Sequence, residues 1–178
     1  NMLSNQGIAG GALAKDHVAE LTELNVINDK LAANQQVTFS DINLAYIPNI
    51  NAVYEAEYVE YINQLDQIAD LSSLILAIGT VNDSMASLDK VIAHATDAEN
   101  NPLVFSDLVK LVGITGLNED LRRFYISDIA QSSPANVDSI DKIQSVVDGI
   151  NATYEVAYVS GALVANVIQG ASVEVYAL

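Results

Sequence analysis

The two histidines, His17 and His94, are the first side chains to consider for chemistry, because imidazole serves both as a general base and as a metal ligand. They lie 77 residues apart, and neither stands in an HExxH pattern or at another ligand spacing from carboxylates. We expect both to be ordinary histidines on helix surfaces. The chain has no cysteine, which excludes thiol nucleophiles, disulfides, cysteine-bound zinc and iron–sulfur clusters.

Paired carboxylates are the next candidates, for acid–base chemistry. They occur in three groups: Asp138 with Asp141, Glu55 with Glu57 and Glu60, and Glu119 with Asp120. A glycosidase or an aspartic protease needs two carboxyl groups that converge in a cleft. These acids instead cluster where helices are expected to begin, and the helix dipole explains them there. The one glycine cluster, GIAGG at 7–11, matches no nucleotide-binding loop. We therefore expect no catalytic, cofactor-binding or metal-binding residue.

Tyrosine supplies a third candidate group. Helical spacing places Tyr54, Tyr58 and Tyr61 on one side of a helix. A similar spacing relates Tyr154 and Tyr158. Two interpretations remain open. The rings form a contact surface for a glycan or a protein, or they pack into a core while their hydroxyl groups reach water.

The charge of the chain limits its partners. Seven basic residues against 23 acidic ones give a formal net charge of −16 and a pI near 4.1. Nucleic-acid binding requires a basic surface that displaces counterions, and an anionic membrane repels an acidic chain. We expect neither nucleic-acid binding nor membrane insertion. Apolar residues make up 51% of the chain, which is enough to form a core.

One short motif occurs twice. FSDI at 39–42 returns as FSDL at 105–108, an offset of 66. IPNIN at 47–51 then faces ITGLN at 114–118 at an offset of 67, which also pairs Tyr58 with Tyr125. Offsets that drift while the apolar pattern is kept are what loop insertions between repeated helices leave.

The repeat continues into two long segments. At an offset of 69, LSSLILAIGTVN at 71–82 faces IDKIQSVVDGIN at 140–151. Four apolar positions match with the spacing of one helical face, and Asn82 matches Asn151. We expect these asparagines to hold a neighbouring loop carbonyl rather than a ligand. ELNVIN at 23–28 resembles the end of such a helix, so a partial copy is expected upstream.

The FSD motif is interpreted as a helix start. Ser40 and Ser106 are suited to be N-caps, and the aspartate after each suits the positive end of the helix dipole. Phe39 and Phe105 precede these expected caps and are expected to anchor the chain on the first turn of their own helices. The motif thus predicts a structural role.

These patterns predict an all-α fold of two tandem copies of a multi-helix unit, with a short, a medium and a long helix in each, packed as a bundle or repeat array. Asn51 and Asn118 are expected to cap the medium helices, and Ser133–Pro134 fits N-cap and N1 of the last long helix. Helices are expected at 13–33, 41–47, 52–64, 71–95, 107–113, 119–131 and 137–168. The expected domains are a partial unit at 1–36, repeat units at 37–100 and 101–170, and a connector or strand at 171–178, with the junction between the two units at 95–104.

The C-terminal part contains an uncharged stretch at 157–173. It is slightly short for a bilayer span, and Asn166 and Gln169 interrupt it, so we expect a buried helix there. Its portion at 157–168 is the expected surface for self-association.

From FSDLVKLVGITGLNEDLRRFYISDIAQ at 105–131 to VVDGIN at 146–151, the chain resembles the helical tandem repeats of very large, adhesin-like surface proteins of Gram-negative bacteria. The resemblance spans about 39–168. It implies an extracellular, cell-surface location, modules joined in series as a stalk or filament, and no active site. The glycine-aspartate calcium motifs that such proteins carry elsewhere are absent from this sequence.

The sequence and the resemblance together favour a non-enzymatic structural module that acts as a stalk, a spacer or a self-assembling filament subunit. Its expected partners are copies of itself or neighbouring modules of the same chain. The alternative is an adhesion module that binds a glycan or a protein through its tyrosine-rich helix faces.

Overall fold

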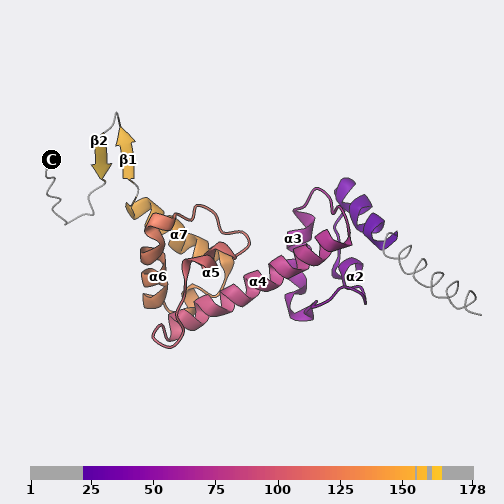
Figure 1. Ribbon diagram of the computed structural model, residues 1–178, viewed down its shortest axis with the longest axis horizontal. Coiled ribbons are helices and arrows are strands. Elements are labelled where there is room, and N and C mark those ends of the chain that lie inside the picture. Colours follow the sequence, from indigo (N-terminus) through magenta and orange to yellow (C-terminus); the bar gives the residue numbers. More distant parts are fainter. Residues whose placement is uncertain (1–21, 155, 160–161, 166–178) are drawn as a thin grey trace, which may run out of the picture. The chain divides into compact units, whose positions relative to one another are not determined.

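The computed structural model describes residues 22–154, 156–159 and 162–165 (Figure 1). These residues are mainly helical, as the sequence predicts. The helices are a first described helix at 22–32, α2 (Phe39–Ile42), α3 (Glu55–Asn63), α4 (Leu71–Thr96), α5 (Phe105–Val109), α6 (Arg122–Gln131) and α7 (Ile140–Tyr154). Short 3₁₀ turns, η1 (Ala52–Tyr54), η2 (Glu119–Leu121) and η3 (Pro134–Asn136), precede α3, α6 and α7.

The chain forms two compact units, Asn1–Asp83 and Ser84–Leu178. The division lies inside α4, which passes from one unit into the other without a break. The composition of 95–104 had predicted a junction there, but 97–104 instead connects α4 to α5 within the second unit. We call Asn1–Asp83 unit 1 and Ser84–Leu178 unit 2.

Unit 1 buries apolar side chains from the first described helix, α2, α3 and the first half of α4. Ile27, Ile42 and Ile62 are fully buried. Helix α4 begins directly after Asp70, whose carboxylate accepts the Ser73 backbone N–H at 2.7 Å, as an N-cap does. Leu74, Ile78 and their neighbours then face this core with the predicted helical spacing.

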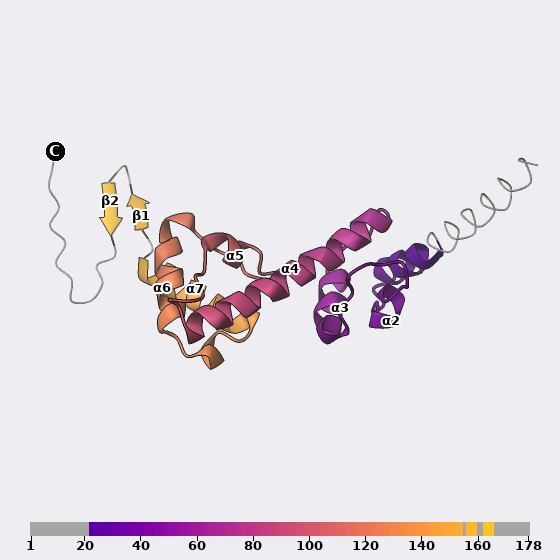
Figure 2. The ribbon, with the colours of Figure 1, turned by 60° about the horizontal axis from the view of Figure 1, so that its bottom comes forward.

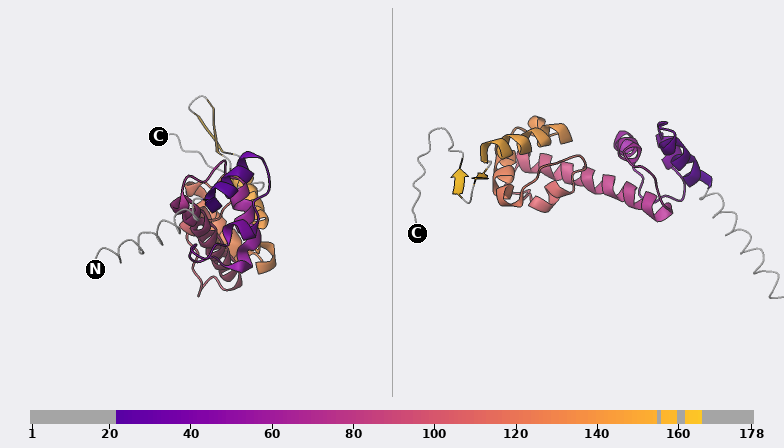
Figure 3. Two further views of the ribbon diagram at one scale, coloured as in Figure 1. Left: turned by 90° about the vertical axis from the view of Figure 1, so that its right-hand side faces the viewer. Right: turned by 90° about the horizontal axis from the view of Figure 1, so that it is seen from above.

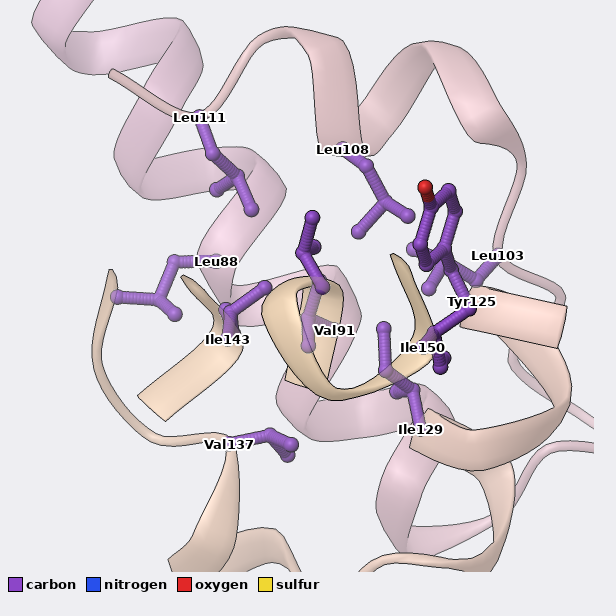
Figure 4. Packing of buried hydrophobic residues seen from close by; sticks show 11 residues of the cluster. Leu88, Val91, Leu103, Leu108, Leu111, Tyr125, Ile129, Val137, Ile143 and Ile150 are labelled. Carbon is purple, nitrogen blue, oxygen red and sulfur yellow. The ribbon is translucent and has the colours of Figure 1, made fainter. Parts of the chain in front are cut away.

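Unit 2 has a core of the same kind, in which α5, α6 and α7 pack around the second half of α4 (Figures 1 and 2). Figure 4 shows the side chains of this cluster pointing toward one another from all four helices. Val91 from α4, Leu108 from α5, Ile129 from α6 and Ile143 from α7 are each fully buried. Both cores therefore use α4, each through a different half of the helix.

Helix α4 is also long and apolar enough to cross a bilayer, judged by length and composition alone. Its apolar residues have another explanation within the described part of the chain. Ala77, Val81, Leu88 and Val91 are buried in the unit cores, and the helix also carries Asp89 and Lys90 on its exposed side.

The FSD segments begin helices, but two positions earlier than predicted. The N-caps are Thr38 and Val104, so the prediction of Ser40 and Ser106 as caps is wrong. The aspartate of each motif takes over the capping: the carboxylates of Asp41 and Asp107 accept the backbone N–H of the cap residues at 2.7 and 3.2 Å.

Asn51 and Asn118 are confirmed as caps, because each side chain accepts a backbone N–H two residues later, at 3.1 and 3.0 Å. They cap the short turns η1 and η2 that lead into α3 and α6. Ser133 and Pro134 occupy the N-cap and first position of η3 rather than of the long helix.

The end of the last long helix differs from the prediction. Helix α7 stops at Tyr154 instead of continuing to 168, and an antiparallel hairpin follows, β1 (Val156–Val159) with β2 (Ala162–Ala165) (Figure 3). The polar residues in this uncharged run are too few to reveal its period, so the pattern alone does not separate helix from strand. The valines and Tyr158 favour the strand. The predicted self-association helix at 157–168 is therefore wrong. The predicted connector at 171–178 lies outside the described residues.

Truncation of one core residue tests the packing of unit 2. Ile129→Ala leaves a cavity at a fully buried position, and we expect the free energy of unfolding to fall by about 2–5 kcal/mol. Chemical denaturation monitored by circular dichroism measures this. Val109→Ala is the matched control, because Val109 is 60% exposed, and its effect should stay within about 0.5 kcal/mol. Equal losses from both substitutions would contradict the described core.

Candidate functional site

The most organised polar arrangement in unit 1 surrounds the hydroxyl group of Tyr58. This hydroxyl donates a short hydrogen bond to Asn82 Oδ1 and accepts the backbone N–H of Asn51 at 3.1 Å. The amide Nδ2 of Asn82 donates to the carbonyl oxygen of Asn49 at 3.0 Å. Helix α3, helix α4 and the loop before η1 are thereby joined. We call this arrangement the tyrosine–asparagine clasp.

Unit 2 contains the same clasp. The Tyr125 hydroxyl donates to Asn151 Oδ1 and accepts the Asn118 backbone N–H at 3.2 Å. Asn151 Nδ2 donates to the Gly116 carbonyl oxygen at 2.8 Å. The predicted role of Asn82 and Asn151, to hold a loop carbonyl, is thus confirmed in both units.

The two loop residues that present these carbonyls share an uncommon backbone conformation. Asn49 has φ 62° and Gly116 has φ 70°, a left-handed region that glycine and asparagine adopt more readily than other residues. A Cβ on Gly116 would lie 3.3 Å from Asn151 Nδ2. Each loop therefore carries a residue suited to turn its carbonyl toward the clasp asparagine.

Both clasp tyrosines are fully buried, and each hydroxyl both donates and accepts within the clasp. A phenol group has one proton to donate, so neither hydroxyl is available for proton transfer to a ligand. A buried donor without its acceptor costs about 1–3 kcal/mol. The clasp therefore joins the segments that meet at each tyrosine hydroxyl.

The phenylalanines of the FSD motifs pack on the clasp rings. Phe39 and Tyr58 have ring centroids 6.3 Å apart with an interplanar angle of 9°. Phe105 and Tyr125 lie at 6.4 Å and 15°. The predicted contact of each phenylalanine with its own first turn is thus replaced by a contact with the following medium helix. The motif anchors α2 to α3 and α5 to α6.

Each FSD aspartate also forms an ion pair that the sequence did not predict. Lys30 Nζ lies 2.5 Å from Asp41 Oδ2, and Lys90 Nζ lies 2.7 Å from Asp107 Oδ1. The pairs span 11 and 17 residues, so no constant offset in the repeat relates the two lysines. The shared Asp-Lys dipeptides at 29–30 and 89–90 are the sequence feature that could have identified them.

These contacts shift the acidity of both carboxyl groups in the same direction. Burial by itself raises the pKa of Asp107, but hydrogen bonds from Lys90 and the Val104 N–H, with the charge of Lys90, hold this pKa below its ordinary value of 3.8. The pKa of Asp41 is lowered by the same balance, with Lys30 and Thr38 as the donors. Both carboxylates are therefore stabilised in the charged form, as structural anions.

The predicted tyrosine contact surface is mostly engaged in packing. Tyr58 is fully buried, and Tyr54 packs edge-on against it with centroids 6.4 Å apart. Tyr154 stacks on Phe124 at 4.1 Å. Tyr61 is half-buried on α3. The backbone of Tyr158 belongs to β1, away from the helical face on which it was predicted.

His94 is buried, so its prediction as a surface histidine is wrong. Its Nδ1 lies 2.8 Å from the carbonyl oxygen of Asn101 and its Nε2 lies 3.3 Å from that of Ile126. The ring links the connection after α4 to α6. The sequence predicts this connection as a polar linker. Its polar composition does not reveal that it lies against the His94 side chain. His17 and the glycine cluster at 7–11 lie outside the described residues.

The paired carboxylates do not converge into a reaction centre among the described residues. Asp138, just before α7, pairs with Lys142 at 2.6 Å, and Glu119 and Asp120 lie in the first turn of η2. The described part of the chain holds no group of three or more histidine and carboxylate side chains that could bind a metal ion.

Comparison of the chain with protein-family models, with curated proteins and with solved structures found no match.

A double-mutant cycle tests the clasp. Tyr125→Phe and Asn151→Ala each leave a buried polar group without its partner, so each should lower the free energy of unfolding by about 1–3 kcal/mol. The double variant should lose less than the sum of the two, since the residues act together. Denaturant unfolding supplies the energies. Tyr61→Phe is the control, with an expected change within about 0.5 kcal/mol. Additive losses at Tyr125 and Asn151 would show that no coupling exists.

Acid unfolding tests the ion pair. Because the pKa of Asp107 is lower in the folded chain, the unfolded chain binds more protons below about pH 4. The stabilisation from Asp107 is present above that pH and is lost as the pH falls toward the folded pKa. Asp107→Asn should lower stability at pH 7, and its difference from the parent chain should shrink on acidification. Urea titrations at several pH values measure this. A difference that stays constant with pH would refute the assignment.

Proposed function

We propose that the two units are tandem copies of one helical module, and that the module has a structural role. The support is the set of contacts that both units contain. In each, a lysine of the preceding helix pairs with the FSD aspartate, the FSD phenylalanine stacks on a buried tyrosine, and that tyrosine is clasped to an asparagine and a loop. The sequence offset between the two copies is 60 for the lysines, 67 for the tyrosines and 69 for the asparagines. Loops of different length in the two copies explain these different offsets.

The proposed copy begins with the helix before the FSD motif and ends at the clasp asparagine. In this frame, 22–83 and 84–154 are the two copies, and α4 supplies the last helix of the first and the first helix of the second. A module that begins and ends in a continuous helix joins to its neighbour without a linker. That is the connection expected of modules in series.

The role we propose is that of a non-enzymatic stalk or spacer in an extracellular bacterial surface protein. The main support is that the polar residues common to both units form their ion pairs and hydrogen bonds within their own unit. The acidic composition without cysteine is compatible with a cell-surface setting, and the resemblance to adhesin-like helical repeats points the same way. Neighbouring modules, or further copies of the chain in a filament, are the proposed partners.

The alternative of an adhesion module that binds through tyrosine faces has less support. Tyr58, at the centre of the first tyrosine group, is fully buried and has no surface to offer. Tyr154 has its ring against Phe124.

Single-molecule unfolding tests the structural role. When the chain is stretched between its ends, two tandem modules of similar size should give two separate extensions, each on the order of 20 nm for a chain that becomes fully extended. Tyr125→Phe should lower the force of one extension and leave the other unchanged, because the clasps belong to different units.

Two results would contradict the proposal. One is a single extension that includes both units, which would mean that they are not separate modules. The other concerns location: an antibody against the chain should label intact cells of the source organism, and labelling only after permeabilisation would exclude a surface stalk.

A further inference from the structure

Unit 1 contains an open groove with a volume of about 980 Å³. One side is formed by the end of the first described helix and the residues after it, from Leu31 to Gln36. The other side is formed by α3 and the turn that follows it, from Ala56 to Asp66. The groove lies entirely within unit 1.

Five amide side chains line this groove. They are Asn34, Gln35, Gln36, Asn63 and Gln64. Asn63 is occupied, since it donates to the carbonyl oxygens of Val37 and Val59 and accepts the Val37 N–H. The other four are exposed. Each offers two N–H donors and one carbonyl acceptor.

The lining also has a definite charge. Glu60 and Asp66 are its only ionisable residues, so the groove is acidic and contains no lysine or arginine. Leu31, Val59 and Leu65 provide apolar surface between the polar groups. A ligand complementary to this surface is neutral or basic and has alternating donors and acceptors.

In unit 2, the corresponding surface is that of α6 just after the clasp tyrosine, Tyr125. Val59, which lines the groove, follows the clasp tyrosine directly, and so does Ile126 in unit 2. The Ile126 carbonyl oxygen faces His94, whose other ring nitrogen faces the Asn101 carbonyl oxygen of the connection to α5. His94 thus ties a polypeptide segment of the chain itself to the α6 backbone just after the clasp tyrosine.

The connection in unit 1 is too short to do the same. Lys30 and Asp41 are 11 residues apart, whereas Lys90 and Asp107 are 17 apart. Helix α4 continues past Lys90 to Thr96, but the first described helix ends at residue 32 and Asn34 turns the chain with φ 52°. With six residues fewer, the unit 1 connection is tied to α3 through Asn63 instead, and Ala56, Glu60 and Gln64 stay exposed. This comparison rests on the proposed equivalence of the two units.

We propose that the unit 1 groove binds an extended polypeptide segment that carries lysine or arginine, from a partner other than this chain. The free amides match the donors and acceptors of a peptide backbone, as side-chain amides do in general. Glu60 and Asp66 select basic side chains. A second copy of the chain is disfavoured as the occupant of this groove because the chain has only seven lysine and arginine residues against 23 acidic ones.

Nuclear magnetic resonance with the full ¹⁵N-labelled chain tests this proposal. The probe is a short, end-blocked peptide of alternating alanine and lysine, at physiological ionic strength. We expect shifts in the side-chain amide signals of Asn34, Gln35, Gln36 and Gln64. A peptide with glutamine in place of lysine should bind more weakly, and one with glutamate should cause no shift.

Two variants locate the binding. Glu60→Lys should weaken the lysine peptide about tenfold, by replacing an attraction with a repulsion. Ala56→Arg should do the same by filling the groove, and it introduces the residue that unit 2 has at Arg123, two positions before its clasp tyrosine. The matched control is Ser127→Lys, the α6 position that corresponds to Glu60, and it should leave the affinity unchanged.

Other outcomes would overturn the proposal. Shifts spread over the acidic surface, with equal weakening by Ser127→Lys, would mean unspecific attraction of a basic peptide. Shifts in the groove with a neutral oligosaccharide but not with the peptide would assign it to glycans. If the two units prove not to be equivalent modules but the groove binds the peptide, the tandem proposal fails and the binding site stands.

Discussion

The buried tyrosine hydroxyl is the interaction on which each unit depends. It lies where a medium helix, a long helix and a loop with one left-handed residue meet. It is hydrogen-bonded to the long helix and to the loop at the same time. Apolar packing alone is non-directional and tolerates sliding of one helix along another. A hydrogen-bond network that is satisfied only in one arrangement removes that freedom, because a slipped arrangement leaves buried polar groups without partners. The clasp thus fixes how far the helices of each unit can slide along one another, while the apolar core holds them together.

The other repeated contacts reinforce the same point. The phenylalanine of the FSD motif lies against the clasp ring, so the short helix and the clasp support each other. The aspartate two residues later ties that short helix back to the preceding helix through a lysine. Chain segments distant in sequence are therefore joined by three kinds of contact around one ring. The groove of unit 1 differs from these inward contacts, because exposed side-chain amides line it.

The sequence predicted those features that depend on periodicity and on matched positions. Helix α4 and the loop contact of Asn82 and Asn151 follow from an apolar stripe with one polar residue at its edge. The prediction failed where two neighbouring residue types can both cap a helix. Beside Ser40 and Ser106, the aspartates cap more effectively because a carboxylate is the stronger acceptor. It also failed at 156–165, where every position is uncharged and the period is hidden. The connections from Lys30 to Asp41 and from Lys90 to Asp107 differ in length, and the sequence shows this only as an irregular offset. The sequence therefore did not predict the lysine pairs, the burial of His94 or the groove.

Hydrogen exchange at the backbone N–H groups of Asn51 and Asn118 tests the clasp most directly, because these two amides donate to the tyrosine hydroxyls at 3.1 and 3.2 Å. If the clasp holds each unit together, both amides exchange only when their unit opens as a whole, as slowly as amides of the core helices. If they exchange as fast as exposed loop amides while the helices remain protected, the hydroxyl bonds do not restrain the loops and the account is wrong.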